Sequence, residues 1–226
     1  STMQWAERQM KRAEEAGASI ITVTHQNVLA QNRLLSQGFL LDHHEEMEQL
    51  LKAHGIALNL SGHVHIQHIA ESGGLYDIAT GSLTVYPHRY GVLTVDPDGS
   101  ITYETKPVNV ERWDGEKAGI PGKYGDFEAL SQAYFDACTR KKMKKELEAL
   151  SLSEEERAQM TELAVEMNRN YFAGMTEPEK EVKDTEGWKL WKEKGAELFF
   201  GKYMDSMLED AGCDENKLKI VRDLRP

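Results

Sequence analysis

The stretch from position 56 to position 65 reads Ile56-Ala57-Leu58-Asn59-Leu60-Ser61-Gly62-His63-Val64-His65. Its first half is a short, mostly apolar run that is typical of a buried strand, and Gly62 follows that run closely. We expect His63 and His65 to leave the end of this strand in extended chain, where residues two apart point to the same side. Gly62 would let the backbone come close to a ligand. The stretch therefore predicts a strand that ends in two imidazoles facing one site.

A second apolar run has the same kind of ending. Ser19-Ile20-Ile21-Thr22-Val23-Thr24 leads into His25, and the polar residues Gln26 and Asn27 follow. In open α/β sheets the ligand crevice lies at the carboxyl ends of the strands, so we expect His25 to lie near His63 and His65. Neutral imidazole nitrogens are suitable ligands for zinc, iron and manganese.

Histidine is also a common surface residue and a hydrogen-bonded core residue. The chain has eight histidines, all within the first 88 residues. We interpret His43, His44 and His54 as ordinary histidines, because clustering alone is only a compositional hint of metal binding.

Length, charge and composition restrict the class of protein. A chain of 226 residues with 40% hydrophobic residues can form two domains with real cores. The net charge of -11 argues against a nucleic-acid polymer as partner. The basic run Lys141-Lys142-Met143-Lys144-Lys145 is interpreted as a solvated helix face. Cys138 and Cys213 lack metal-type spacing and are expected to be free thiols.

No apolar run approaches the length of about 18 residues that a membrane span needs, and no signal peptide is recognisable. The cellular compartment is therefore left open, and the cytoplasm is the default expectation. Most of the charged residues follow position 115, whereas every histidine precedes it. We place a domain boundary there, giving domains 1–115 and 116–226, with a Gly- and Pro-containing connector from Trp113 to Gly125.

Helices and strands are expected to alternate before the boundary. Apolar spacing predicts helices over 2–16 and 42–54 and strands over 19–24 and 56–60. Further strands are predicted at 75–79, 82–85, 91–95 and 101–105, the last two joined by the turn Asp96-Pro97-Asp98-Gly99.

The pattern past the boundary is helical throughout. Helices are predicted over 127–150, from a capping box at Ser153-Glu154-Glu155-Glu156 to about Phe172, and over 186–208, with a short last helix from Glu215. Aromatic residues at helical spacing in this region are expected to be core residues: Trp188, Trp191, Phe199, Phe200 and Tyr203.

These motifs together resemble the C-terminal half of a calcineurin-like metallophosphoesterase. The resemblance rests on Val23-Thr24-His25-Gln26-Asn27 and Gly62-His63-Val64-His65, each after a strand. Ile66-Gln67-His68-Ile69 and Thr80-Gly81-Ser82 through Tyr86-Pro87 are similar to the cyclic-nucleotide phosphodiesterase subgroup, some members of which carry an added C-terminal helical domain. The implied fold class is α/β (α+β): the C-terminal half of a four-layer αββα sandwich, followed by a separate all-α domain.

The resemblance also implies a dinuclear metal centre for the hydrolysis of phosphate esters. Carried over by motif, His65 would bind one divalent ion and His25 and His63 the other, with manganese, iron or zinc as the metal. Two such ions can act together in an in-line displacement at phosphorus. The expected substrate is a phosphodiester of the cyclic-nucleotide kind.

The chain departs from that family in a large respect. The family's Asp-x-His, Gly-Asp and Gly-Asn-His motifs, which supply most other ligands, do not occur before His25. Asp42 and Asp77 are better explained as a helix start and a strand-edge residue. We therefore expect a fragment that is catalytically inactive alone, with its exposed sheet covered by the missing N-terminal half or by another copy.

Four more residues are candidates near the metals or the substrate. His88 and Arg89 lie between two predicted strands, and a cation there could bind a phosphate oxygen, although an ordinary exposed turn is the simpler interpretation. Asn27 could orient His25 as a hydrogen-bonded partner, and Tyr90 is a similar case.

Two alternatives to the enzyme remain open. Residues 120–226 could be a non-catalytic protein-interaction module, with the histidines as a vestigial or incidental metal site. A structural zinc site is the third hypothesis, but such sites usually have four Cys and His ligands, and both cysteines are far from the histidines in sequence.

Overall fold

The computed structural model of the chain describes residues 2–113 and 126–221 and has a mixed α/β architecture. Its contacts divide the chain into two compact units, Ser1–Thr80 and Gly81–Pro226. The domain boundary predicted between residues 115 and 116, and nearly all of the connector around it, lie outside the described residues. Each compact unit is described separately below.

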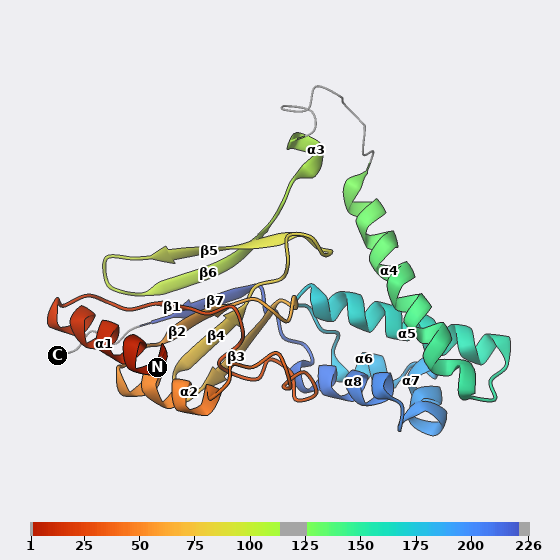
Figure 1. Cartoon of the computed structure of the whole chain (residues 1–226). Helices are drawn as coiled ribbons and strands as arrows, with labels where there is room; N and C mark the ends of the chain where they lie inside the picture. Colours follow the sequence, from red (N-terminus) through yellow and green to blue (C-terminus); the bar gives the residue numbers. More distant parts are fainter. Residues whose placement is uncertain (1, 114–125, 222–226) are drawn as a thin grey trace. The chain divides into compact units, whose positions relative to one another are not determined.

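A four-stranded mixed sheet forms the first unit (Figure 1). Its strands are β1 (Thr22–Val23), β2 (Leu58–Ser61), β3 (His68–Ser72) and β4 (Leu75–Ala79). Their order is β1-β2-β4-β3, with β1, β2 and β4 parallel and β3 antiparallel to β4. The parallel arrangement brings the carboxyl ends of β1 and β2 to the same edge of the sheet.

Two helices pack on this sheet through a shared apolar core. They are α1 (Thr2–Glu15) and α2 (His44–Ala53), and Figure 1 shows them beside the strands. The buried members of the core are Met10, Val28, Leu29, Leu51, Ile56 and Leu75. The predicted helices over 2–16 and 42–54 are thus confirmed to within two residues at each end.

The strand predictions for this unit were correct in part. β4 has the predicted bounds, whereas β1 is only two residues long. β3 was missed, because His68 and Glu71 interrupt the apolar pattern that predicts a strand. The paired glycines Gly73 and Gly74, both with positive φ, form the turn that lets β3 pair with β4.

The second unit begins with a β-hairpin. β5 (Arg89–Val95) and β6 (Ile101–Pro107) are antiparallel, and the turn at Asp96-Pro97-Asp98-Gly99 is confirmed by its hydrogen bond from Gly99 N–H to the Asp96 carbonyl, 2.9 Å. β7 (Lys217–Ile220) pairs with β6, so the sheet order is β5-β6-β7. The predictions of a strand over 82–85 and of a last helix from Glu215 are therefore wrong. Alternating burial in Lys217–Ile220 is a strand pattern too short to recognise from sequence.

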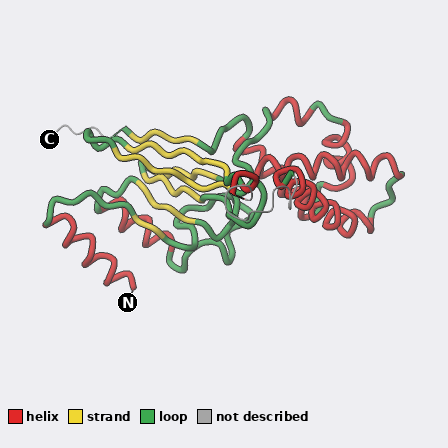
Figure 2. The backbone as a smooth tube through the Cα atoms, turned by 90° about the horizontal axis from the view of Figure 1, so that it is seen from above, coloured by secondary structure: helices red, strands yellow, loops and turns green. Residues whose placement is uncertain are grey.

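The other elements that the structure describes in the second unit are helices (Figure 2). They are α3 (Val110–Trp113), α4 (Phe127–Glu146), η2 (Leu147–Ala149), α5 (Glu154–Phe172), α6 (Glu179–Lys183), α7 (Glu186–Leu190), η3 (Trp191–Gly195), α8 (Phe199–Met207) and η4 (Leu208–Asp210). The predicted helix over 127–150 corresponds to α4 followed by η2. The capping box at α5 is confirmed, since Ser153 accepts from the Glu156 N–H and the Glu156 side chain accepts from the Ser153 N–H.

The predicted continuous helix over 186–208 is wrong. The chain instead forms α7, the π-helical turn η3 and then α8 after a break at residues 196–198. Close backbone contact explains the break, because a Cβ on Gly201 would lie 2.3 Å from the Gly195 carbonyl oxygen. This approach of α8 to the end of η3 buries the Trp191 ring and lets its Nε1–H donate to the Met160 carbonyl, 2.8 Å away.

No helix among residues 2–113 and 126–221 is long and apolar enough to cross a membrane.

Candidate metal centre

His25 and His63 meet at the carboxyl edge of the first sheet. His25 Nε2 and His63 Nδ1 are 2.9 Å apart, and the two rings are T-shaped with their centroids 4.8 Å apart. His25 is exposed and His63 is half-buried, so the pair is open to solvent on one side. The expectation that these two histidines lie close together is confirmed by this geometry.

The pairing of β1 with β2 brings the two histidines together. Thr24 N–H donates to the Leu60 carbonyl, 2.9 Å away, which extends the parallel pairing just past the end of β1. Gly62 N–H then donates to the His25 carbonyl, 3.2 Å away. The backbones of the two loops are therefore joined next to both imidazoles. A Cβ on Gly62 would meet no protein atom within 4 Å, so packing inside the chain does not require a glycine here.

His65 is arranged differently from the prediction. Its backbone is left-handed, with φ of 60°, and its N–H donates to the Gly62 carbonyl at 3.2 Å, which closes a turn over residues 62–65. The prediction of extended chain at His63 and His65 is therefore wrong. Val64 is buried between them, and burial of this apolar side chain explains why the chain turns instead of continuing straight. His65 itself is exposed.

The geometry of the histidine pair fits one divalent metal ion. Two imidazole nitrogens that each lie about 2.0–2.1 Å from a zinc ion are roughly 2.9–3.4 Å apart at metal angles of about 90–110°. The observed 2.9 Å falls within this span. However, the described parts of the chain contain no group of three or more His, Cys, Asp or Glu side chains placed to hold a metal ion. The two histidines alone would therefore supply only part of a ligand set.

A buried carboxylate lies beneath the two histidine loops. Asp77, on β4, is fully buried and lies inside the sheet, since β4 runs between β2 and β3. One oxygen accepts from Val28 N–H (2.6 Å) and Leu29 N–H (2.8 Å), and the other from the Asn59 amide (2.8 Å) and the Ser61 hydroxyl (2.8 Å). Its interpretation as a strand-edge residue is therefore wrong. Sequence reasoning missed this role because the partners are 16 to 49 positions away.

Asn27 lies next to the candidate site but does not bond to His25. Its side-chain amide donates to Ser61 Oγ, 2.7 Å away, while its Oδ1 is buried without a hydrogen-bond partner. Its backbone N–H and carbonyl bond to Phe39 and Leu41. Phe39 in turn packs against the His63 ring, with centroids 5.5 Å apart. Asn27 thus connects the loop after β1 with the end of β2.

His88 and Arg89 belong to the second unit. His88 has a left-handed backbone, with φ of 54°; its Nδ1 lies 2.9 Å from the Leu83 carbonyl and its Nε2 2.5 Å from Ser131 Oγ on α4. Arg89 Nη1 donates to Thr105 Oγ1 (3.0 Å) and Asn216 Oδ1 (3.2 Å). Both side chains therefore have partners within this unit, whereas the Arg89 Nε atom is buried without a hydrogen-bond partner.

Four other side chains bear on the sequence-based interpretations. His54 has a largely buried side chain, 11% exposed, and its Nδ1 lies 2.6 Å from Glu14 Oε1. The Tyr90 side chain is exposed. The Tyr86 side chain is partly buried, which raises the pKa of the Tyr86 phenol, and its hydroxyl donates to Gln132. Asp42 lies two residues before α2, so it is not the residue that immediately precedes this helix.

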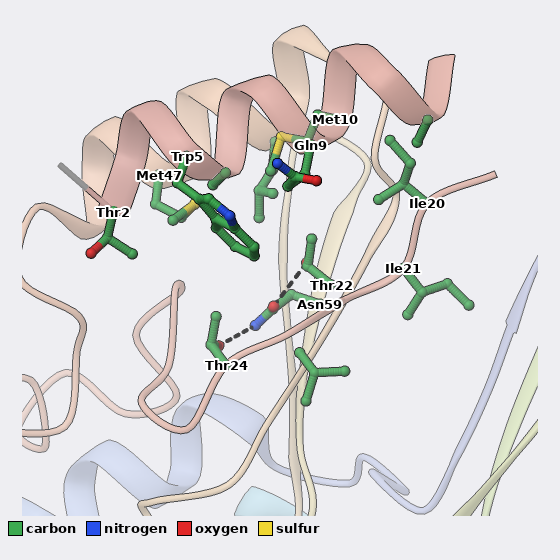
Figure 3. A pocket seen from close by; sticks show the side chains of 14 residues that line it. Thr2, Trp5, Gln9, Met10, Ile20, Ile21, Thr22, Thr24, Met47 and Asn59 are labelled. Carbon is green, nitrogen blue, oxygen red and sulfur yellow. Dashed lines mark hydrogen bonds between the residues drawn. The ribbon is translucent and has the colours of Figure 1, made fainter. Parts of the chain in front are cut away.

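An apolar groove runs along α1 in the first unit. Its volume is about 460 Å³, and Figure 3 shows Trp5 and Met10 on the helix side and the Thr22, Asn59 and Thr24 side chains opposite. Asn59 Oδ1 accepts from the Thr22 hydroxyl and its amide donates to the Thr24 hydroxyl, both at 2.9 Å. The groove therefore reaches the residue that directly precedes His25.

The sequence of the helical region matches a known family. Residues 109–214 match the family described as the C-terminal domain of cyclic nucleotide phosphodiesterase. This region is thus a C-terminal domain of that type, and it relates the chain to phosphodiesterases, which are hydrolases. The match begins after the last histidine and does not reach the histidine pair. No curated protein matches the chain.

Proposed function

We propose that this chain is part of a metal-dependent phosphodiesterase of the calcineurin-like class, in which His25 and His63 bind one divalent ion. The observation that carries the proposal is the 2.9 Å separation of their facing nitrogens at the carboxyl edge of a parallel strand pair. The phosphodiesterase-type domain at residues 109–214 supports it independently. In this proposal residues 1–115 form the C-terminal half of the four-layer catalytic sandwich.

The remaining assignments follow the same proposal. His65 would bind a second ion, and further ligands would come from outside residues 2–113 and 126–221. Bound manganese, iron or zinc ions supply positive charge that stabilises the phosphoryl oxygens in the transition state. His25 and His63 orient toward the site because their loops are joined by backbone hydrogen bonds, while Phe39 shields one side of His63 from water.

His88 and Arg89 are proposed substrate contacts for the phosphate ester, which we infer to be a cyclic nucleotide or a related diester. A guanidinium such as that of Arg89 can donate to a phosphate oxygen. Because the ligand set is incomplete, we expect the chain alone to hydrolyse bis-p-nitrophenyl phosphate no faster than manganese in buffer.

Metal binding by the chain tests the proposal directly. Calorimetric titration with cobalt or zinc should show one site per chain, and this binding should be lost in His63→Ala and in His25→Ala. His54→Ala is the matched control, because this histidine of the same unit bonds to Glu14 and is not part of the pair. Equal binding by His63→Ala and the unsubstituted chain would reject the assignment.

The alternative is a non-catalytic interaction module formed by the helical region. Two exposed apolar side chains one turn apart on α4, Leu130 and Tyr134, are the observation in its favour. In this alternative the histidine pair is a vestigial or incidental metal site on which the function does not depend. Two results together would favour this alternative. The unsubstituted chain would not bind cobalt, and its binding to a protein partner would be lost on replacing Leu130 and Tyr134 by serine.

A further inference from the structure

The strongest polar network in the first unit connects Asp77 with both histidine loops. From Asp77, one branch passes through Asn59 to the Thr24 hydroxyl, which itself donates to the Gln26 carbonyl at 2.7 Å. Thr24 and Gln26 are the residues directly before and after His25. This branch therefore fixes the backbone on both sides of that histidine (Figure 3 shows its Asn59–Thr24 step).

The second branch reaches the other histidine. Ser61, two residues before His63, donates its hydroxyl hydrogen to Asp77 and accepts from the Asn27 amide. The loop after His25 makes two further hydrogen bonds to the Asp77 carboxylate, from the N–H groups of Val28 and Leu29. All four hydrogen bonds of the Asp77 carboxylate are thus made to groups within four residues of His25 or His63.

We infer that Asp77 is a positioning residue, whose carboxylate sets the separation and orientation of the His25 and His63 imidazoles. The donors explain why a carboxylate is needed. The Val28 N–H, the Leu29 N–H and the Asn59 NH₂ group are donors only, so the site requires a group that accepts on both oxygens. A buried charge is tolerated where it receives several charge-assisted hydrogen bonds, as Asp77 does.

An amide at this position cannot replace the carboxylate. In Asp77→Asn, the side-chain NH₂ would face either the two backbone N–H groups or the Asn59 amide and the Ser61 hydroxyl. Ser61 can rotate to accept, but Asn59 can do so only by turning its amide, which breaks its bonds to Thr22 and Thr24. The disturbance therefore reaches the residue before His25.

This inference rests on the proposed role of the pair as metal ligands, and its first measurement works without metal. Two-dimensional ¹H–¹⁵N spectra of the imidazoles in the metal-free full chain report which ring nitrogens carry a proton. With the pair 2.9 Å apart, we expect a hydrogen-bonded pattern for His25 Nε2 and His63 Nδ1. Asp77→Asn should lose this pattern and give the averaged signals of free imidazoles.

The second measurement uses cobalt as the probe, because its visible absorption reports ligand geometry. Asp77→Asn should weaken cobalt binding about 10- to 100-fold, the loss typical of residues that orient a metal histidine. Leu51→Ala is the control: it removes a fully buried side chain from the core of the same unit, and that side chain makes none of the network's hydrogen bonds. It should lower thermal stability yet keep the imidazole pattern and the cobalt spectrum.

A second variant covers the case in which Asp77→Asn does not fold. Ser61→Ala removes the link between Asp77 and Asn27 and should shift the His63 signals. A folded Asp77→Asn or Ser61→Ala chain with unchanged imidazole signals would overturn the inference. Failure of the unsubstituted chain to bind cobalt would instead reject the proposed metal site, while the metal-free spectra would still decide the role of Asp77.

Discussion

Asp136 and Arg169 form an ion pair between α4 and α5, with 2.7 Å between Asp136 Oδ2 and Arg169 Nη1. The side chain of Asp136 is only 9% exposed and that of Arg169 is 23% exposed. Removing the acid in Asp136→Ala leaves the guanidinium partly buried without its counter-charge. We expect a loss of about 2–3 kcal/mol in the free energy of unfolding, measured by urea denaturation, because an uncompensated charge is costly away from water.

The pair Arg140–Glu162 provides the matched control between the same two helices. It has the same 2.7 Å separation, but its side chains are 44% and 58% exposed. Glu162→Ala should therefore cost less than about 1 kcal/mol. If both substitutions had equal effects, burial of Asp136 would not explain its contribution.

At the scale of elements, Glu48 joins α2 to β3. Its carboxylate accepts from Lys52 on its own helix (2.6 Å) and from the Ser72 hydroxyl (2.7 Å). The hydrogen bond from Lys52 is the largest cause, and that from Ser72 the next, of a pKa for Glu48 below its usual 4.5, with His44 adding a smaller effect. A carboxyl group whose pKa is lower in the folded state stabilises the fold above its unfolded pKa, and this stabilisation is lost as the pH falls through the folded pKa.

Glu48→Gln should therefore lower the midpoint of thermal unfolding at neutral pH and flatten its decline below pH 4.5. Thermal melts followed by circular dichroism over this range give the measurement. Glu45→Gln, an exposed change on the same helix, should leave the pH dependence as it is. A Glu48→Gln curve parallel to that of the unsubstituted chain would show that the contact between α2 and β3 does not depend on the charge.

Local signals account for most of the elements that sequence could predict. The helices α1, α2, α4 and α5 were predicted from apolar spacing and caps, which act within a few residues. The break between η3 and α8 could not be predicted, because it depends on the approach of Gly201 to the Gly195 backbone. Phe199 shows the same limit: it has the helical spacing of a core residue but is exposed on α8.

At the candidate site, too, local signals could be predicted from the sequence and long-range contacts could not. Strand endings predicted that His25 and His63 meet, because parallel strands end at the same edge. The turn at His65 and the role of Asp77 escaped prediction, since burial of Val64 and hydrogen bonds over 16 to 49 positions decide them. That the site has ligands beyond His25 and His63 stays a prediction, and the cobalt titration tests it.

For the second unit as a whole, the strand β7 and the residue before it connect the helices with the hairpin. Asn216 donates to the Ala173 and Gly174 carbonyls at the end of α5 and accepts from the Thr105 hydroxyl on β6. Ile220 then pairs with Ile101, and both are buried. Asn216 and β7 lie after residue 214, where the phosphodiesterase-type domain match ends. The helical domain should therefore unfold together with the hairpin sheet.

Two neighbouring substitutions test this coupling. Ile220→Asp places a charge where the side chain is 8% exposed, and a two-stranded hairpin without β7 is only marginally stable, so we expect a loss of about 3 kcal/mol. Val221→Asp makes the same change at a 73% exposed side chain and should cost less than about 0.5 kcal/mol. Urea unfolding should be followed by helical circular dichroism and by tryptophan fluorescence, since Trp188 and Trp191 lie in the helical core. The urea midpoints of both signals should shift together in Ile220→Asp, because the strand and the helices share the contacts of Asn216. A helical signal that keeps the midpoint of the unsubstituted chain would show that the helices fold without β7.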